Sequence, residues 1–203
     1  MDFIDDDPTW PFTRAKTAVI RAAASVIRES GPRAATLKNI AQKAGITEPA
    51  IFRHFEGVDG LFKGLFFLFE RLSAKITACF DRPEKGLARV LAATRSILDI
   101  FCRNKDFAYL ILHAEHIFRG YDDLRKNLTE IRSADNSTAL GALEEAREMG
   151  ELRKDVLPKL AAVAIMGILF YTVQGWVEND GEFDIVTFAA GRVEALLGLF
   201  RNS

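Results

Sequence analysis

Hydrophobic residues recur at helical spacing along most of the chain, and no segment shows the sustained alternation of a strand. Residues 13–30 illustrate the pattern, with Val19, Ala22 and Val26 on a stripe that would face a core. Thr13 can cap this helix, and the Gly-Pro pair that follows residue 30 ends it. The spacing therefore predicts an all-α protein of about nine helices.

The later helices follow from the same period. We expect them over residues 59–80, 87–101, 107–118, 121–149, 158–178 and 184–201. The helix over 121–149 is polar, and Ser133-Ala134-Asp135 is a candidate break in it. The run from Leu160 to Val177 is apolar over 18 residues, so a membrane span must be weighed. Thr172 and Gln174 interrupt it and no basic flank follows, which favours a helix buried by its own domain and by a partner.

Residues 36–55 predict two short helices joined by a tight turn. Thr36 can cap the first helix, and Ile40, Ala41 and Ala44 form its inward stripe. A glycine at position 45 ends that helix, because glycine readily adopts the left-handed conformation required there. This layout is that of a helix-turn-helix that reads the DNA major groove.

The second short helix has its own signals. We expect Ile46 to be the buried plug of the turn, Thr47 to cap the helix, and Pro49 to occupy its first turn. Ile51 and Phe55 lie one turn apart and should face inward. The residues left to face outward or toward the first turn are Glu48, Ala50, Phe52, Arg53 and His54.

The run TLKNIAQKAGITEPAIFRHFEGVDGLF resembles the N-terminal domain of the tetracycline-repressor (TetR) family of bacterial transcription regulators. The likeness extends from Thr13 to about Leu72, and residues 150–155 (GELRKD) resemble a common family turn before the penultimate helix. The resemblance implies a helix-turn-helix DNA-binding domain at 13–64, with its motif at 36–55. It also implies a larger helical domain at 65–203 that binds a ligand and forms a homodimer.

The resemblance also implies which side chains meet DNA. Lys38 stands where the family often touches a base, and Glu48, Pro49, Ala50 and Arg53 stand at base-facing positions of the recognition helix. Arg53 could bond guanine, and Ala50 or Pro49 could meet a thymine methyl. The phosphate positions are Thr36, Thr47 and His54. Helix capping alone also explains Thr36 and Thr47, and a favourable charge at a helix N-terminus also explains Glu48.

Two positions depart from the family pattern. Phe52 replaces the usual tyrosine, whose hydroxyl commonly bonds a phosphate, and Val58 replaces the usual lysine. Lys63, further along the next helix, is a candidate to compensate. These departures keep a second reading open, in which the protein has weakened DNA binding and works mainly through protein association.

Charge is distributed unevenly along the chain. The formal net charge is −1, but residues 13–63 hold nine basic and four acidic residues, a balance of +5. Positive charge thus lies on the segment with the helix-turn-helix pattern, as phosphate binding requires. The N-terminus is acidic, which is unlike a signal peptide, so we expect a cytoplasmic protein. Cys79 and Cys102 have no metal-ligand spacing, and we expect two buried free thiols.

We expect the last two predicted helices to pair with a partner, and the resemblance implies that the partner is a second copy of the chain. The positions that we assign to the dimer interface are Leu160, Ala164, Gly167, Tyr171, Trp176, Phe188, Val193, Leu196 and Phe200. A two-fold dimer would present two recognition helices to one inverted-repeat operator. Repression, with release by a ligand, follows from the resemblance.

Aromatic and sulfur-containing residues are frequent after position 65, so we expect a mainly apolar pocket with few polar groups. Its candidate residues are Phe66, Phe69, Phe101, Phe107, Tyr109, His113, Met166, Phe170 and Gln174. A hydrophobic or aromatic small molecule is the expected effector. His113 and His116 could contribute to a metal site. We favour the alternative, in which one of the two side chains faces the core and the other faces solvent. No catalytic motif of the common enzyme classes is present, so a helical-bundle enzyme is only an alternative, and we expect no cofactor or metal.

Overall fold

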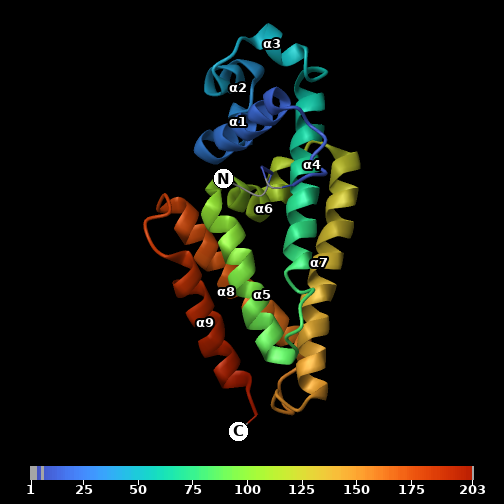
Figure 1. The fold of residues 1–203 in the computed structure, drawn as a ribbon, viewed down its shortest axis with the longest axis vertical. Coiled ribbons are helices and arrows are strands. Elements are labelled where there is room, and N and C mark those ends of the chain that lie inside the picture. Colours follow the sequence, from blue (N-terminus) through green and yellow to red (C-terminus); the bar gives the residue numbers. More distant parts are fainter. Residues whose placement is uncertain (1–3, 6, 203) are drawn as a thin grey trace.

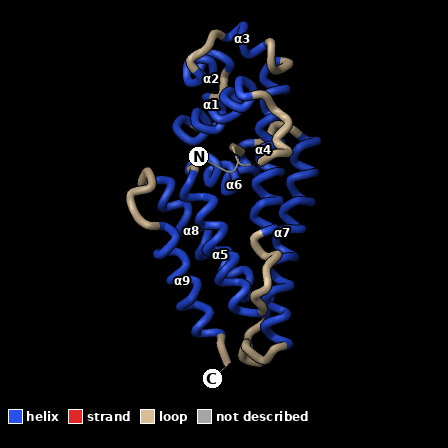
Figure 2. The backbone as a smooth tube through the Cα atoms, in the orientation of Figure 1, coloured by secondary structure: helices blue, strands red, loops and turns tan. Residues whose placement is uncertain are grey.

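The structure is a computed structural model that describes residues 4, 5 and 7–202, except for the side chain of Asp135. Its described part is built from helices, with no named strand, and the predicted all-α class is confirmed (Figures 1 and 2). The helices are α1 (Arg14–Ser30), α2 (Leu37–Ala44), α3 (Glu48–Phe52), α4 (Gly57–Ala78), α5 (Gly86–Arg103), α6 (Lys105–Ile117), α7 (Asp122–Glu148), α8 (Pro158–Glu178) and α9 (Ile185–Phe200). A short 3₁₀ turn, Pro32–Ala34, separates α1 from α2.

The molecule is elongated, with a small head of α1, α2 and α3 at the upper end of Figure 1 and a longer body of α5 to α9 below. Helix α4 belongs to both parts. Its first half packs Leu61 and Leu65 into the core that holds Ile20, Ile40 and Ile51 of the head. Its second half runs down the body beside α7. The predicted boundary between residues 64 and 65 therefore falls inside one continuous helix.

Two contacts, in addition to a shared buried core, help to fasten the head to the rest of the protein. At Gly64 of α4 the backbone approaches the head so closely that an added Cβ would lie 2.9 Å from Cε1 of Phe55. At the other contact, Arg28 of α1 donates from Nε to Oδ1 of Asp106 on α6 at 2.5 Å. Asp180, in the loop after α8, lies 3.8 Å from the same guanidinium group. The head thus rests on α4 on one side and on α6 on the other.

The segment before α1 crosses from the head to α4. Asp7 accepts a hydrogen bond at 2.6 Å from Arg71 of α4, and this guanidinium lowers the pKa of the Asp7 carboxyl to about 2. Trp10 donates from its indole nitrogen to Thr17 of α1 at 2.7 Å. Its ring also packs on Phe67 of α4, with centroids 5.6 Å apart. This N-terminal arm therefore ties α1 to the middle of α4.

Helix α7 is continuous over Asp122–Glu148, so the candidate break at 133–135 is absent. The hydroxyl groups of Ser137 and Thr138 donate to the carbonyl oxygens of Ser133 and Ala134, at 2.8 and 3.1 Å. Each hydroxyl group bonds the carbonyl oxygen four residues earlier in its own helix, a pattern that is compatible with a continuous helical backbone.

Helices α8 and α9 leave an apolar surface uncovered. On α8 the exposed fraction is 63% for Leu160, 65% for Val163 and 75% for Tyr171, and on α9 it is 47% for Phe188. Gly167 is also exposed, while Ala164, Leu196 and Phe200 are half-buried. Helix α8 is long and apolar enough to cross a membrane, and 33% of its most apolar window is buried. Uncovered apolar side chains on two neighbouring helices are typical of a protein interface.

Three predictions made for side chains are wrong. Trp176 and Val193 are only 5% and 0% exposed, so they belong to the protomer's own core rather than to a surface that a partner could reach. The indole of Trp176 donates to the carbonyl oxygen of Phe183, 3.1 Å away, which fixes the loop between α8 and α9. Cys102 is exposed rather than buried, because its neighbour Phe101 takes the inward position on α5; Cys79 is half-buried.

Candidate nucleic-acid interface and interior cavity

The turn between α2 and α3 is closed by backbone hydrogen bonds. Gly45 adopts the left-handed conformation (φ 67°, ψ 30°), and its N–H donates to the carbonyl oxygen of Gln42 at 3.2 Å. The N–H of Ile46 donates to Ala41 at 3.0 Å, which completes a Schellman motif. At the other end of α2, Thr36 accepts from the N–H of Asn39 at 3.2 Å, as its predicted capping role requires.

The structure corrects three details of this motif. Ile46 is 37% exposed and is not a buried plug, because the Schellman bonds close the turn without its side chain. Thr47 occupies the N-cap position of α3 but makes no capping hydrogen bond with its side chain. Ala50 is only 9% exposed and packs inward, so little of its methyl group remains for a thymine contact. Ile51 and Phe55 are buried as predicted, and they hold α3 against the head.

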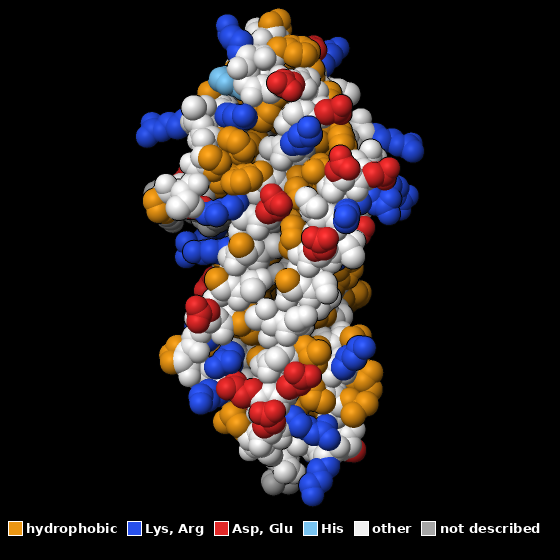
Figure 3. Space-filling view, turned by 90° about the vertical axis from the view of Figure 1, so that its right-hand side faces the viewer, with side chains coloured by type: hydrophobic (Ala, Val, Ile, Leu, Met, Phe, Trp, Pro, Cys, Tyr) orange, Lys and Arg blue, Asp and Glu red, His pale blue; other side chains and the backbone are white. Residues whose placement is uncertain are grey.

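The outer face of the motif carries the other predicted DNA-contacting side chains. Thr36, Lys38, Thr47, Glu48, Pro49, Arg53 and Lys63 are exposed, His54 is half-buried, and Phe52 is 58% exposed. Figure 3 shows Lys and Arg side chains projecting around the head end of the molecule. The structure thus presents these residues on one end of the chain, where a duplex could reach them.

Ion pairing divides the basic residues of the head into two groups. Lys43 donates to both carboxylate oxygens of Glu29 at 2.8 Å, and this bond lowers the pKa of Glu29. Arg28 is paired with the body, as described above. In contrast, Lys38, Arg53 and Lys63 make no ion pair with any described residue. An unpaired surface cation can bind a phosphate or a base edge without first breaking a bond.

An apolar cavity of about 190 Å³ lies inside the body. Helices α4 to α8 all contribute to its wall, and four of the predicted pocket residues line it, namely Phe69, Phe101, Met166 and Phe170. Phe66 and Phe107, 3% and 1% exposed, are instead buried in the core next to the head. The cavity therefore lies where the sequence placed a pocket, with fewer aromatic residues than expected.

Tyr109, His113 and Gln174 form a separate cluster between α6 and α8. Nε2 of His113 lies 2.8 Å from Oε1 of Gln174, and the Tyr109 and His113 ring centroids are 4.2 Å apart. Burial lowers the pKa of His113, although the bond to Gln174 acts in the opposite direction. His116 is exposed, as the sequence reading expected. Among the described residues no group of three potential metal ligands occurs.

The residues predicted for the pocket did not include the polar residues of the cavity wall. Thr94 of α5 and Arg132 and Asn136 of α7 line the cavity, together with Ala139 and Leu143 on the same face of α7. The signal in the sequence is the spacing of Arg132, which is half-buried one turn after Leu128, on a face where apolar residues are expected; Asn136 is exposed at the edge of the cavity. Polar residues at inward positions are candidates for ligand contacts.

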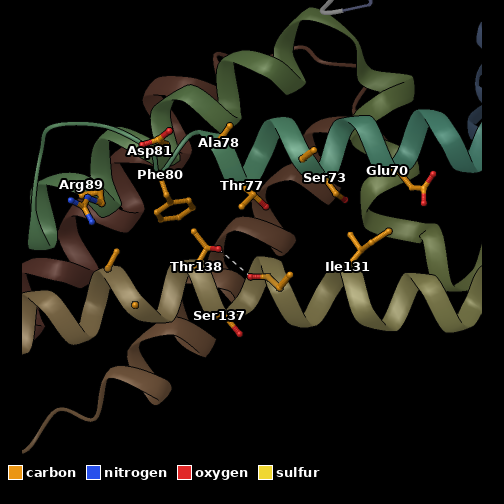
Figure 4. A pocket seen from close by; sticks show the side chains of 14 residues that line it. Glu70, Ser73, Thr77, Ala78, Phe80, Asp81, Arg89, Ile131, Ser137 and Thr138 are labelled. Atoms are coloured by element: carbon orange, nitrogen blue, oxygen red, sulfur yellow. Dashed lines mark hydrogen bonds between the residues drawn. The ribbon is translucent and has the colours of Figure 1, made fainter. Parts of the chain in front are cut away.

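A second, open hollow of about 770 Å³ lies between α4 and α7 (Figure 4). Ser73 and Thr77 of α4, with Phe80 just after it, point toward Ile131 and Thr138 of α7. Ser73 and Phe80 also line the interior cavity, so these two side chains separate the cavity from the open groove. The same stretch of α4 therefore forms a wall of both spaces.

Comparisons with known proteins agree with this arrangement. The family model of the bacterial regulatory proteins of the tetR family matches residues 19–65, which include α2, α3 and the start of α4. The fatty acid metabolism regulator protein of Bacillus subtilis (strain 168) is 27% identical over 91% of this chain and 94% of its own length. The N-terminal domain of this chain belongs to the tetR family of bacterial regulatory proteins.

Solved structures share the fold of the whole chain. The ketosteroid transcriptional regulator KstR2 of Mycobacterium tuberculosis superposes with a TM-score of 0.81 at 18% identity, covering 95% of this chain and 97% of that one. The transcriptional regulator FadR of Bacillus subtilis, solved in complex with stearoyl-CoA, gives a TM-score of 0.68 at 23% identity, covering 89% and 97%. Both structures are of transcriptional regulators, and the Bacillus subtilis (strain 168) relative described above is a regulator protein as well.

Proposed function

We propose that this regulator is a cytoplasmic repressor that binds an inverted-repeat operator as a homodimer and leaves it when an apolar effector enters the interior cavity. The observation that carries the proposal is the continuity of α4. Leu61 and Leu65 of this helix lie in the core of the head, and Phe69, Ser73 and Ile76 line the cavity. Because one rigid element forms part of both sites, a ligand that moves its lower half must also move the head.

The DNA side of the proposal rests on the exposed, unpaired cations. Arg53 is suited to a bidentate contact with guanine, and Lys38 and Lys63 to base or phosphate contacts. The apolar face of α8 and α9 supplies the dimer contact, through Leu160, Tyr171 and Phe188. A two-fold dimer with heads about 34–36 Å apart, or somewhat more, would reach successive major grooves of one duplex.

The effector side rests on the cavity wall, which is mostly apolar. The solved relatives are consistent with an effector that has a large apolar part, since one was crystallised with stearoyl-CoA, which carries a long acyl chain, and another is a ketosteroid regulator. For release, the effector must bind the conformation that does not fit the operator more tightly than the one that does. By linkage, operator DNA must then weaken effector binding by the same factor.

Selection of genomic fragments by the purified protein tests the proposal directly. We expect an enriched inverted repeat, bound at nanomolar concentration with an affinity that falls steeply as salt rises. Adding the effector should reduce that affinity without dissociating the dimer. Weak binding with no enriched sequence, at a concentration where the dimer forms, would exclude the repressor function.

One observation favours a second function. Phe52 is 58% exposed on the outer face of the head, where its ring offers apolar surface but no hydroxyl group for a phosphate. Such a surface suits a protein partner better than DNA. Phe52→Tyr separates the two functions: a repressor should gain operator affinity from the added phosphate contact, whereas a protein-associating relative should show no sequence-specific binding in either form.

A further inference from the structure

Arg132 is the one charged residue among the described residues that line the interior cavity. It lies on the inward stripe of α7, with Leu128 one turn before it and Asn136 one turn after it. The rest of the wall is mainly aliphatic and aromatic, with Ser73, Thr94 and Asn136 as the other polar residues. A guanidinium group in such surroundings is costly unless something compensates its charge.

The protein compensates this charge only in part. Nη2 of Arg132 donates to the carbonyl oxygen of Ile111 on α6 at 3.0 Å. Nε is buried and has no hydrogen-bond partner. No described carboxylate pairs with the guanidinium group. A water molecule cannot reach Nε in this structure, and a water bound elsewhere on the group would leave the positive charge uncompensated.

The charge of Arg132 restricts the ligand. A carboxylate can accept from two nitrogen atoms of one guanidinium group, in the planar bidentate arrangement that arginine favours. An alcohol, ester or thioester presents an uncharged oxygen and cannot neutralise the cation. A guanidinium group in the cavity wall that pairs with no described carboxylate is therefore a better match for an acid than for its uncharged derivatives.

The size of the cavity restricts the rest of the ligand. An apolar cavity of about 150 Å³ accepts benzene, so 190 Å³ accommodates one ring or roughly six to eight carbon atoms. A coenzyme A group is far too large and too highly charged for this space. A long chain would have to pass Ser73 and Phe80 into the groove between α4 and α7.

We propose that the effector is a free monocarboxylic acid with an apolar body of about six to eight carbons or one ring, anchored through its carboxylate by Arg132. This inference rests on the proposed function and names the ligand class of the same cavity. The carboxylate lies against α7 and α6, and the apolar body points toward Phe69 and Ser73 of α4. The ligand thus bridges the fixed wall of the cavity and the helix that carries the head.

Calorimetric titration of the full-length protein with octanoic acid, 1-octanol and octanoyl-CoA tests the anchor. We expect the wild type to bind octanoic acid at least tenfold more tightly than octanol. Arg132→Met, which keeps the unbranched stem, should bind the two compounds alike, and Arg132→Lys should show an intermediate preference. Arg125→Met is the matched control, because Arg125 lies on the same helix with its side chain 49% exposed and should not affect binding.

The outcomes separate this inference from the proposed function. Equal binding of acid and alcohol by the wild type, or an acid preference that survives Arg132→Met, would overturn the carboxylate anchor while leaving an apolar effector in place. Tightest binding of octanoyl-CoA would overturn the free-acid class in favour of a thioester. If none of the three compounds binds or releases operator DNA, both the anchor and the effector function of the cavity fail, whereas DNA recognition is judged by the fragment selection alone.

Discussion

Replacing Gly64 with alanine tests how tightly the head is seated on α4. The added Cβ would lie 2.9 Å from Cε1 of Phe55 and 3.3 Å from Cδ1 of Ile20, both buried side chains. Overpacking of a dense core costs about 1–3 kcal/mol. Alanine also favours a helix over glycine by up to about 1 kcal/mol. The packing term is the larger, so we expect a net loss of stability of roughly 0–2 kcal/mol.

Gly60 provides the matched control on the same helix. An added Cβ there would meet its nearest neighbour at 3.5 Å, an ordinary contact, so Gly60→Ala should gain the helix preference without the packing cost. The two variants should therefore differ by about 1–3 kcal/mol in free energy of unfolding. Thermal unfolding at one protein concentration measures this, and the difference corresponds to roughly 2–12 °C in Tm. Equal stability of the two variants would refute the close seating of the head at Gly64.

Three further predictions concern the operator, the N-terminal arm and the dimer. Arg53→Ala should cost about 1–3 kcal/mol of operator affinity and relax the sequence preference at one base pair, measured by fluorescence anisotropy. Because Asp7 has a lowered pKa of about 2 in the folded protein, its contribution to stability is present above its ordinary pKa of 3.8 and is lost as the pH falls toward 2. Asp7→Asn should remove that part of the pH dependence in unfolding measurements. Tyr171→Glu should shift the sedimentation coefficient toward that of a monomer. Met149 is also an exposed hydrophobic residue, at 51%, but lies outside α8 and α9, so Met149→Glu should leave the coefficient unchanged.

Each of these predictions has an outcome that would contradict it. Uniform weakening of all DNA sequences by Arg53→Ala would make this residue a phosphate contact instead of a base contact. An unchanged acid unfolding curve for Asp7→Asn would mean that the bond to Arg71 adds nothing to stability. A Tyr171→Glu protein that stays dimeric would place the interface on another face.

The head was predictable because short-range signals determine it. Thr36 and Gly45 act through the backbone of α2, and their roles depend on few contacts from outside the motif. Ile46 was misjudged because the backbone bonds of the Schellman motif close the turn without its side chain, and Thr47 because the N–H of Ala50 donates to its backbone carbonyl oxygen and not to its hydroxyl group. Periodicity alone cannot reveal that exchange between backbone and side-chain bonding.

The body was less predictable because tertiary packing decides which of its apolar residues are buried and which are exposed. Trp176 and Val193 repeat with the same apolar spacing as Tyr171, yet only the last is exposed, since each apolar helix packs on several neighbours. The cavity wall shows the same limit. Arg132 stands out only when the face of α7 that points inward is known.

The two fastenings of the head have a consequence for how the protein can move. The first is the seat of Phe55 on Gly64, and the second is the Arg28–Asp106 ion pair. They are two parts of a wider attachment, because the buried core that contains Ile20 of the head continues into α6 through Phe107, and Asp7 of the N-terminal arm bonds Arg71. A head attached over such an area cannot turn freely on the body and moves only with the helices on which it packs. While these attachments survive effector binding, the direction of its displacement on the operator is set by α4 and α6 before any ligand arrives, and effectors of different shape would alter how far the heads move.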